Sequence, residues 1–109
     1  VLLRLARVAR SVLREGDILV RYGGEEFLAI LPGASRHDVI NIGDRLRRKV
    51  SETRIEEGDE SIQVTISQGG VSFPENDVPN ETELVNRADQ ALYRAKESGR
   101  NCVVMASGS

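Results

Sequence analysis

The sequence predicts an α/β (α+β) fold, in which helices flank a central sheet that contains an antiparallel hairpin. Apolar residues recur at helical spacing in three segments, and they form short strand-like runs in four others. Two of these runs, residues 18–20 and 28–31, flank Gly23-Gly24, a dipeptide that closes two-residue hairpins because glycine adopts positive φ without strain. The predicted order is therefore helix, strand, strand, helix, strand, helix, strand.

Composition limits the classes of protein to which the chain can belong. Its 109 residues allow one domain at most. The formal net charge of −2 argues against a general binder of nucleic-acid polymers, whereas a small anionic ligand needs only a local cationic pocket. No apolar run approaches membrane-spanning length, and a cytoplasmic setting fits. The single Cys102 excludes an internal disulfide and a cysteine metal cluster.

The first element is a helix expected over residues 2–13, because apolar side chains recur on one of its sides. The opposite side carries Arg4, Arg7, Arg10 and Arg14. This run of arginines is most simply a solvated face. Gly16 is placed to end the helix. Arg14 differs from the other arginines because it stands at the helix end, three residues before Asp17, which opens the next strand.

The second helix is expected after the turn at Pro32-Gly33. Ser35 is its predicted N-cap, and Asp38 stands three residues later in the capping-box position. The acidic stretch 56–60, which comes after this helix, is predicted to be a solvated loop rather than a metal site.

A third strand is predicted over residues 62–67, where apolar and polar residues alternate, and it is expected to continue to residue 73. Within it, Gln68 and Gly70 fall where a strand that faces helices normally carries apolar side chains. Residues 74–79 are predicted to form a surface loop.

The last helix is predicted to begin after Asn80, which caps it together with Glu83, and to end at Gly99. Alanines on its buried side indicate a close approach to the sheet. Residues 101–105 form a predicted final strand, and residues 106–109 are expected to be a disordered tail.

The hairpin segment Gly23-Gly24-Glu25-Glu26-Phe27 resembles the signature of the GGDEF family, the diguanylate cyclases, which join two GTP molecules into cyclic di-GMP. Residues 88–96, followed by Gly99-Arg100-Asn101, resemble the last helix and turn of that family. Residues 64–67, with Gly69 and Pro74, are similar to its penultimate strand. The resemblance runs from Val8 to Met105, so residues 1–105 are identified as a partial GGDEF domain with a nucleotide-cyclase or palm-like fold.

The resemblance implies a chemistry that suits these residue types. A 3′-hydroxyl attacks an α-phosphorus and pyrophosphate leaves, a reaction that Mg²⁺ (or Mn²⁺) supports by bridging phosphate oxygens. It implies that Glu25 is a metal ligand and that Glu26 assists metal binding or deprotonation of the hydroxyl. Gly23 and Gly24 would let the nucleotide lie close to the backbone.

Two cations are expected to hold the triphosphate of GTP. Lys96 and Arg100, at the end of the last helix and just beyond it, match the family residues that offset charge on the leaving group. The alternative is structural, because a helix C-terminus favours cations through its dipole.

A product-binding site is expected around Arg14-x-x-Asp17, which stands at the family's spacing before Gly23. Arg14 can offer a fork to a guanine edge or a phosphate, and Asp17 can accept from guanine N–H groups. Arg45 occupies the place of the family's second arginine. The alternative for Arg14 and Asp17 is a local ion pair, which contributes little if it is exposed.

The chain departs from the family at its start. The family domain begins with a strand and helix that supply an aspartate metal ligand, phosphate-cradling backbone groups and guanine recognition, and nothing before Arg14 matches them. That strand would lie in the middle of the sheet, beside the second hairpin strand. The fold is therefore expected to lack its first strand and helix, leaving unpaired backbone groups to be covered.

Two functions compete on this basis. The first is a diguanylate cyclase domain that works as a homodimer, because the family brings two GTP-loaded half-sites face to face. The second is a non-catalytic module that binds cyclic di-GMP through Arg14, Asp17 and Arg45. The prediction is that the parent protein converts GTP, whereas these 109 residues alone do not.

Overall fold

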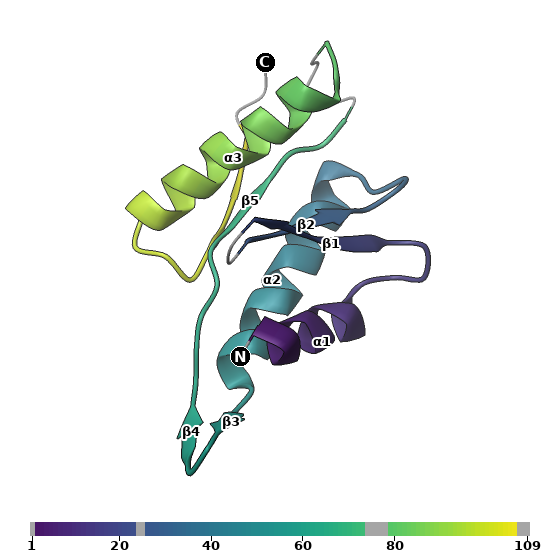
Figure 1. The fold of residues 1–109 in the computed structure, drawn as a ribbon. Helices are drawn as coiled ribbons and strands as arrows, with labels where there is room; N and C mark the ends of the chain where they lie inside the picture. Colours follow the sequence, from purple (N-terminus) through teal and green to yellow (C-terminus); the bar gives the residue numbers. More distant parts are fainter. Residues whose placement is uncertain (1, 24–25, 74–78, 107–109) are drawn as a thin grey trace.

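The computed structural model describes residues 2–23, 26–73 and 79–106 and shows a mixed helix-and-strand fold (Figure 1). The helices are α1 (Leu2–Val12), α2 (Arg36–Glu52) and α3 (Glu81–Glu97). The strands are β1 (Ile18–Gly23), β2 (Glu26–Ile30), β3 (Ile55–Glu57), β4 (Glu60–Ile62), β5 (Gln68–Gly70) and β6 (Val103–Met105). The predicted α/β class is confirmed. No helix in the described ranges is both long enough and apolar enough to cross a membrane.

The starts of α2 and α3 follow from their capping residues, as predicted. The Ser35 hydroxyl accepts a hydrogen bond from the Asp38 backbone N–H, and the Asp38 carboxylate accepts one from the Ser35 N–H, both at 3.1 Å. At α3, the Asn80 side chain accepts from the Glu83 N–H at 2.9 Å. These bonds satisfy N–H groups that the first turn of a helix leaves without a partner.

The strands form three two-stranded sheets in the described part of the chain, rather than one continuous sheet. β1 and β2 pair in antiparallel fashion, with Ile18 opposite Ile30 and Gly23 opposite Glu26. The predicted hairpin is therefore confirmed, although Gly23 ends β1 instead of lying in the turn. The residues between the two strands, Gly24 and Glu25, lie outside the described residues.

Two local predictions are wrong. The acidic stretch 56–60 is not a loop, because β3 and β4 form a second antiparallel hairpin there, with Glu57 opposite Glu60. Residues 63–67 are not a strand. Within the predicted extended segment, Ile62 ends β4 and pairs with Ile55, and residues 68–70 pair in parallel with β6. The alternation of residues 63–67 suits a strand, but the described part of the chain places no partner strand beside them.

The core lies where helices meet helices and where α3 meets the parallel pair. Val8, Ala9 and Val12 of α1 are buried, and α1 packs against α2. Ala91 and Ala95 of α3 are fully buried where this helix contacts β5 and β6. A Cβ atom at Gly69 would overlap the Leu92 amide nitrogen and the Ala88 carbonyl oxygen, so a glycine here lets the helix backbone lie directly on the strand.

The polar and small residues of β5 have structural partners. The Gln68 amide donates to the Gly43 carbonyl of α2 at 2.8 Å. A Cβ at Gly70 would meet the Met105 sulfur at 2.6 Å, so this glycine admits the β6 side chain.

The first residue of the predicted tail, Ala106, is part of the fold. Ala106 is buried, and its N–H donates to the Gly70 carbonyl at 2.7 Å. The rest of that tail, residues 107–109, lies outside the described residues, as do residues 74–78 of the predicted surface loop.

Candidate functional site

The hairpin places part of the predicted catalytic segment. Gly23 and Glu26 are exposed at the ends of β1 and β2, opposite each other across the ladder. Gly24 and the predicted metal ligand Glu25 lie outside the described residues. The donor chemistry of the segment fits magnesium, which prefers carboxylate oxygens and often takes only one or two from the protein. The described residues hold no group of three or more His, Cys, Asp or Glu side chains at metal-binding distance.

The predicted cations stand at the C-terminal end of α3. Lys96 is in the last turn, and Arg100 lies three residues beyond the helix. Both side chains are exposed, and neither forms a hydrogen bond or ion pair through its side chain with another described residue. Both cations are therefore available to an anionic ligand.

The turn after α3 fixes where the Arg100 side chain leaves the backbone. Gly99 ends the helix with φ of 113°. The Arg100 N–H donates to the Ala95 carbonyl at 3.0 Å, which is the 6→1 hydrogen bond of a Schellman motif. Arg100 and Asn101 follow with φ of 66° and 48°. Positive φ is uncommon for residues other than glycine and is often found at functional sites.

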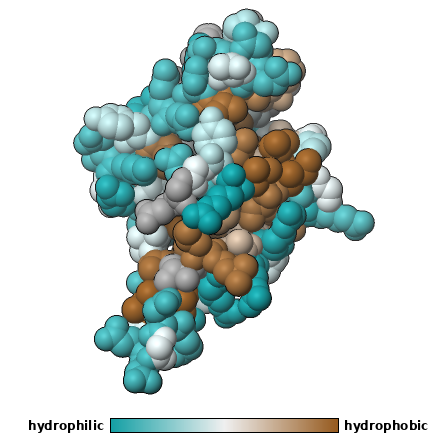
Figure 2. All heavy atoms as spheres, in the orientation of Figure 1, coloured by the Kyte–Doolittle hydropathy of each residue, from teal (hydrophilic) through white to brown (hydrophobic). Residues whose placement is uncertain are grey.

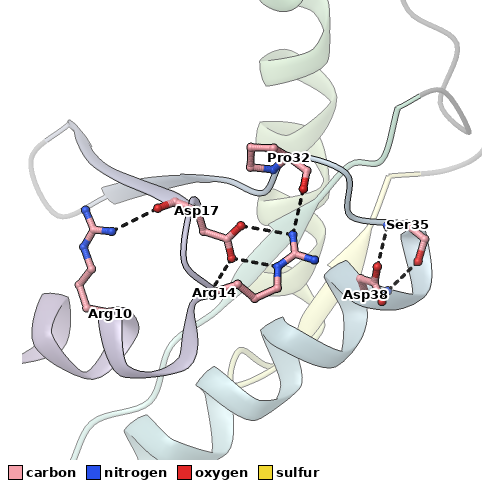
Figure 3. Close-up of polar contacts among 6 residues, drawn as sticks. All are labelled: Arg10, Arg14, Asp17, Pro32, Ser35 and Asp38. Atoms are coloured by element: carbon pink, nitrogen blue, oxygen red, sulfur yellow. Dashed lines mark hydrogen bonds and ion pairs between the residues drawn. The ribbon is translucent and has the colours of Figure 1, made fainter.

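Arg14 and Asp17 form a closed local cluster at the end of α1 (Figure 3). Two guanidinium nitrogens of Arg14 donate to the Asp17 carboxylate. Nε donates to Oδ2 and Nη2 donates to Oδ1, both at 3.2 Å. The Arg14 backbone N–H also donates to Oδ2 at 2.7 Å. The side chain of Asp17 is only 2% exposed, whereas that of Arg14 is 41% exposed. The ion pair is therefore buried at its acidic end and open at its cationic end.

The cluster extends to neighbouring segments that sequence reasoning missed. Arg14 Nη2 donates to the Pro32 carbonyl at 3.2 Å, which ties the end of α1 to the loop after β2. Arg10 Nη1 donates to the Asp17 carbonyl at 3.3 Å. Pro32 lies 18 residues from Arg14, so no local pattern in the sequence could have indicated this contact.

Electrostatics keeps the Asp17 carboxylate charged despite its burial. Burial alone would raise the pKa of Asp17, but the side-chain and backbone hydrogen bonds from Arg14, with its positive charge, lower that pKa overall. The hydrogen bond to Asp17 in turn raises the pKa of Arg14. The pKa of Asp38 is lowered chiefly by its hydrogen bonds to Ser35, with a contribution from the charge of Arg14.

The three residues of the predicted product site, Arg14, Asp17 and Arg45, do not form one cluster in the structure. Arg45 is exposed on α2 and forms no hydrogen bond or ion pair with Arg14 or Asp17. Both carboxylate oxygens of Asp17 are already bonded to Arg14. A guanine edge can reach Asp17 only if Arg14 moves. The local ion pair is thus formed, and the role of these residues in binding a ligand stays a prediction.

Comparison with known proteins identifies the family. The GGDEF family, described as "Diguanylate cyclase, GGDEF domain", matches residues 1–102. Diguanylate cyclase A of Treponema denticola is 38% identical over 109 residues, which are all of this chain and 29% of that protein. Response regulator PleD of Caulobacter vibrioides is 42% identical over 105 residues, covering 94% of this chain and 22% of that protein. The chain thus spans less than a third of the length of these curated relatives.

Solved structures show the same fold. Diguanylate cyclase SiaD of Pseudomonas aeruginosa, in complex with its activator SiaC, aligns with a TM-score of 0.83 at 39% identity, over 94% of this chain and 38% of that one. The active GGEEF domain of a diguanylate cyclase from Vibrio cholerae aligns with a TM-score of 0.80 at 27% identity, over 99% of this chain and 67% of that one. The chain belongs to the GGDEF family.

Proposed function

We propose that this chain is part of a diguanylate cyclase domain, which condenses two GTP molecules into one cyclic di-GMP and two pyrophosphates. The observation that carries the proposal is the complete Gly23-Gly24-Glu25-Glu26-Phe27 signature, at the junction of β1 and β2, in a chain whose family match covers residues 1–102. The chain has both the acidic and the cationic residue types that this chemistry requires.

The acidic residues serve the attacking group. A bound magnesium ion would supply positive charge that stabilises the negative charge developing on the transferred phosphate. Glu25 would hold the ion, and the exposed carboxylate of Glu26 would assist as a ligand or accept the proton of the 3′-hydroxyl. Gly23 and Gly24, which carry no side chains, would leave room for the nucleotide beside the backbone.

The cationic residues serve the leaving group. Lys96 and Arg100 would bind the β- and γ-phosphates and offset the negative charge that builds on pyrophosphate. Their exposure and the fixed turn at Gly99 support this role. Each hairpin supplies one half-site, so two copies would face each other, each holding one GTP.

A second candidate is a module that binds cyclic di-GMP without making it. The Arg14–Asp17 pair favours it, because the Arg14 side chain is 41% exposed and a ligand could contact its guanidinium. The GGDEF domain of DgcB from Caulobacter crescentus, 29% identical to this chain, has been solved in complex with c-di-GMP. Calorimetry with cyclic di-GMP would test this candidate, because Arg14→Ala should abolish binding while Arg48→Ala should not. Equal binding by both variants would rule out the Arg14 site.

We propose that the parent protein is active, whereas these 109 residues alone are not. The chain covers only 62% of a Pseudomonas aeruginosa chain that comprises only the GGDEF domain, so an isolated domain of that protein contains more than this chain supplies.

Incubation with GTP and magnesium tests the proposed function. The full-length protein should form cyclic di-GMP and release two pyrophosphates per product, and ATP should give no product. The 109-residue chain should form none under the same conditions. Cyclic di-GMP formed by the short chain would contradict its proposed inactivity, and a full-length protein that forms none would contradict the cyclase assignment.

A further inference from the structure

The turn that follows α3 contains three consecutive residues with positive φ. Gly99, Arg100 and Asn101 have φ of 113°, 66° and 48°. Glycine adopts positive φ freely, and asparagine is one of the few other residues often found there. Arginine has no such preference, so the left-handed backbone at Arg100 costs free energy. Within the described ranges, Arg100 and Asn101 are the only residues other than glycine with positive φ.

Hydrogen bonds on both sides of the turn fix the path of the chain. The carbonyl of the buried Ala95 accepts from the Arg100 N–H at 3.0 Å and from the Cys102 thiol at 3.5 Å. The Cys102 carbonyl accepts from the Gln68 N–H at 2.9 Å, where the parallel pairing of β5 with β6 begins. The chain therefore has to reverse from the end of α3 to the start of β6 within residues 99–101, and the left-handed backbone makes this reversal.

Contacts within the fold do not explain why an arginine occupies this strained position. The Arg100 side chain is exposed and forms no hydrogen bond or ion pair with any residue that the structure describes. Arg94, by contrast, donates from Nη2 to the Met105 carbonyl at 3.5 Å. Figure 2 shows the surface at the C-terminal end of α3 as largely hydrophilic. Strained residues cluster at functional sites, where the strain preorganises a side chain, so the free guanidinium indicates a ligand.

Asn101 contributes to this turn through its backbone. Its side chain is exposed and forms no hydrogen bond with any residue in the described part of the chain. A β-branched residue with positive φ is a genuine outlier. Such a residue at position 101 would force the chain onto another path between the bonds at Ala95 and Gln68. The point at which the Arg100 side chain leaves the backbone would then move.

We propose that Asn101 is a positioning residue for Arg100. Its left-handed backbone holds Arg100 in the conformation from which the guanidinium reaches the triphosphate of GTP. This inference rests on the proposed function, which assigns Lys96 and Arg100 to that triphosphate. It adds that Asn101 acts through Arg100 and does not itself contact the substrate.

Steady-state kinetics of the full-length protein with GTP and magnesium test the inference. Asn101→Val should lower kcat/KM for cyclic di-GMP formation at least about tenfold, because a displacement of about 1 Å can cost up to about 100-fold. Asn101→Gly should keep at least about half of the wild-type kcat/KM, because glycine adopts the same φ without strain. Asn86→Val, the same substitution at an exposed position of α3, is the matched control and should stay within about twofold of the wild type.

A double-mutant cycle shows whether Asn101 acts through Arg100. Arg100→Ala alone should lower kcat/KM at least as much as Asn101→Val does. Adding Asn101→Val to Arg100→Ala should then cost no more than about a further twofold, because the guanidinium that it would displace is absent. A residue that only supports the fold would instead lower kcat/KM by the same factor in both backgrounds.

Thermal unfolding of the full-length protein without nucleotide tests the backbone strain separately from catalysis. Arg100→Gly should melt at least about 2 °C above Arg100→Ala, because glycine removes the strain and both variants lack the guanidinium. Circular dichroism checks that each variant is folded. If Asn101→Val does not fold, Asn101→Ala takes its place in the cycle, with a smaller loss expected in the same direction.

Four results in an active protein would overturn this inference alone. The first is a folded Asn101→Val variant with wild-type kcat/KM, and the second is Asn101→Gly as impaired as Asn101→Val. The third is an equal effect of Asn101→Val with and without Arg100. The fourth is an Arg100→Gly variant that melts no higher than Arg100→Ala. A full-length wild-type protein that forms no cyclic di-GMP would overturn the proposed function and this inference together.

Discussion

Asp17 shows how one residue combines a structural role with a predicted binding role. Its carboxylate is almost fully buried, yet three donors from Arg14 keep it charged. From the sequence alone, an ion pair and a ligand site are alternative roles for Arg14 and Asp17. The structure shows the pair closed, so any ligand that binds Asp17 has to compete with Arg14 for the same oxygens.

The Arg14–Asp17 pair should make the stability of the fold decrease as the pH falls. The folded-state pKa values of Asp17 and Asp38 are both lowered, so their stabilisation is fully present above the unfolded pKa of about 3.9 and is lost as pH falls through the folded values. Asp17→Asn should lower the melting temperature by about 4–8 °C at pH 7, the shift that loss of one net hydrogen bond produces in a domain of this size. The deficit should shrink as pH falls below the unfolded pKa of about 3.9, because the unfolded chain then takes up a proton that the folded carboxylate resists.

Thermal unfolding followed by circular dichroism at several pH values measures this effect in the absence of nucleotide. Glu97→Gln, on the exposed end of α3, is the control and should melt within about 1 °C of the wild type at each pH. A deficit for Asp17→Asn that is equally large at pH 7 and pH 3 would show that its charge is not what stabilises the fold.

At the scale of single elements, the sequence predicts best those helix ends that are set by hydrogen bonds between residues close together in the chain. α2 and α3 begin directly after their predicted caps, because Ser35 and Asn80 bond backbone groups only a few residues away. The β3–β4 hairpin was missed because glutamate and aspartate are poor strand residues, and the turn at Gly58 outweighs that preference. Residues 63–67 show the reverse error, since alternation alone does not supply a neighbouring strand.

Gly69 is the position between two packed elements at which an added methyl group should lower the free energy of unfolding most. The added Cβ of Gly69→Ala would overlap backbone atoms of Ala88 and Leu92, which cannot move without shifting α3. We expect a loss of about 1–3 kcal/mol in the free energy of unfolding, as overpacking typically costs. Urea unfolding measures this loss.

Gly43→Ala provides the comparison for that experiment. Its added Cβ would meet two methyl groups of Val103 at 3.2 Å, and the gain in helix propensity, about 0.5–1 kcal/mol, offsets part of the crowding. The loss should therefore be clearly smaller than at Gly69. Equal losses at the two positions would contradict the direct contact between α3 and β5.

At the scale of the whole molecule, the described strands form separate pairs, whereas the resemblance predicts a further strand beside β2. β2 pairs only with β1 among the described strands, and β5 pairs only with β6. Ile18 and Ile30, which are cross-strand partners on one face of the first hairpin, are 47% and 46% exposed. Pairing between distant segments depends on long-range contacts, so no local pattern could show that the described strands fall into three separate pairs.

The family was nevertheless predictable from the sequence at this scale. The signature at Gly23–Phe27 and the turn at Gly99-Arg100-Asn101 each consist of adjacent residues, and the family match confirms the assignment that they suggested. The roles of Glu25, Glu26, Lys96 and Arg100 stay predictions, because they concern a ligand and, for Glu25, a position outside the described residues.

The most direct test of the central claim is the rate of cyclic di-GMP formation by the full-length protein carrying Glu25→Gln. This change keeps the size of the side chain and removes the charge that would hold magnesium. Turnover should fall at least about 100-fold, the loss typical when a charge-stabilising group is removed from an active site. Glu97→Gln, which alters an exposed glutamate at the end of α3, should retain wild-type turnover. Turnover by Glu25→Gln equal to that of the wild type would contradict the claim that the signature carboxylate serves GTP condensation.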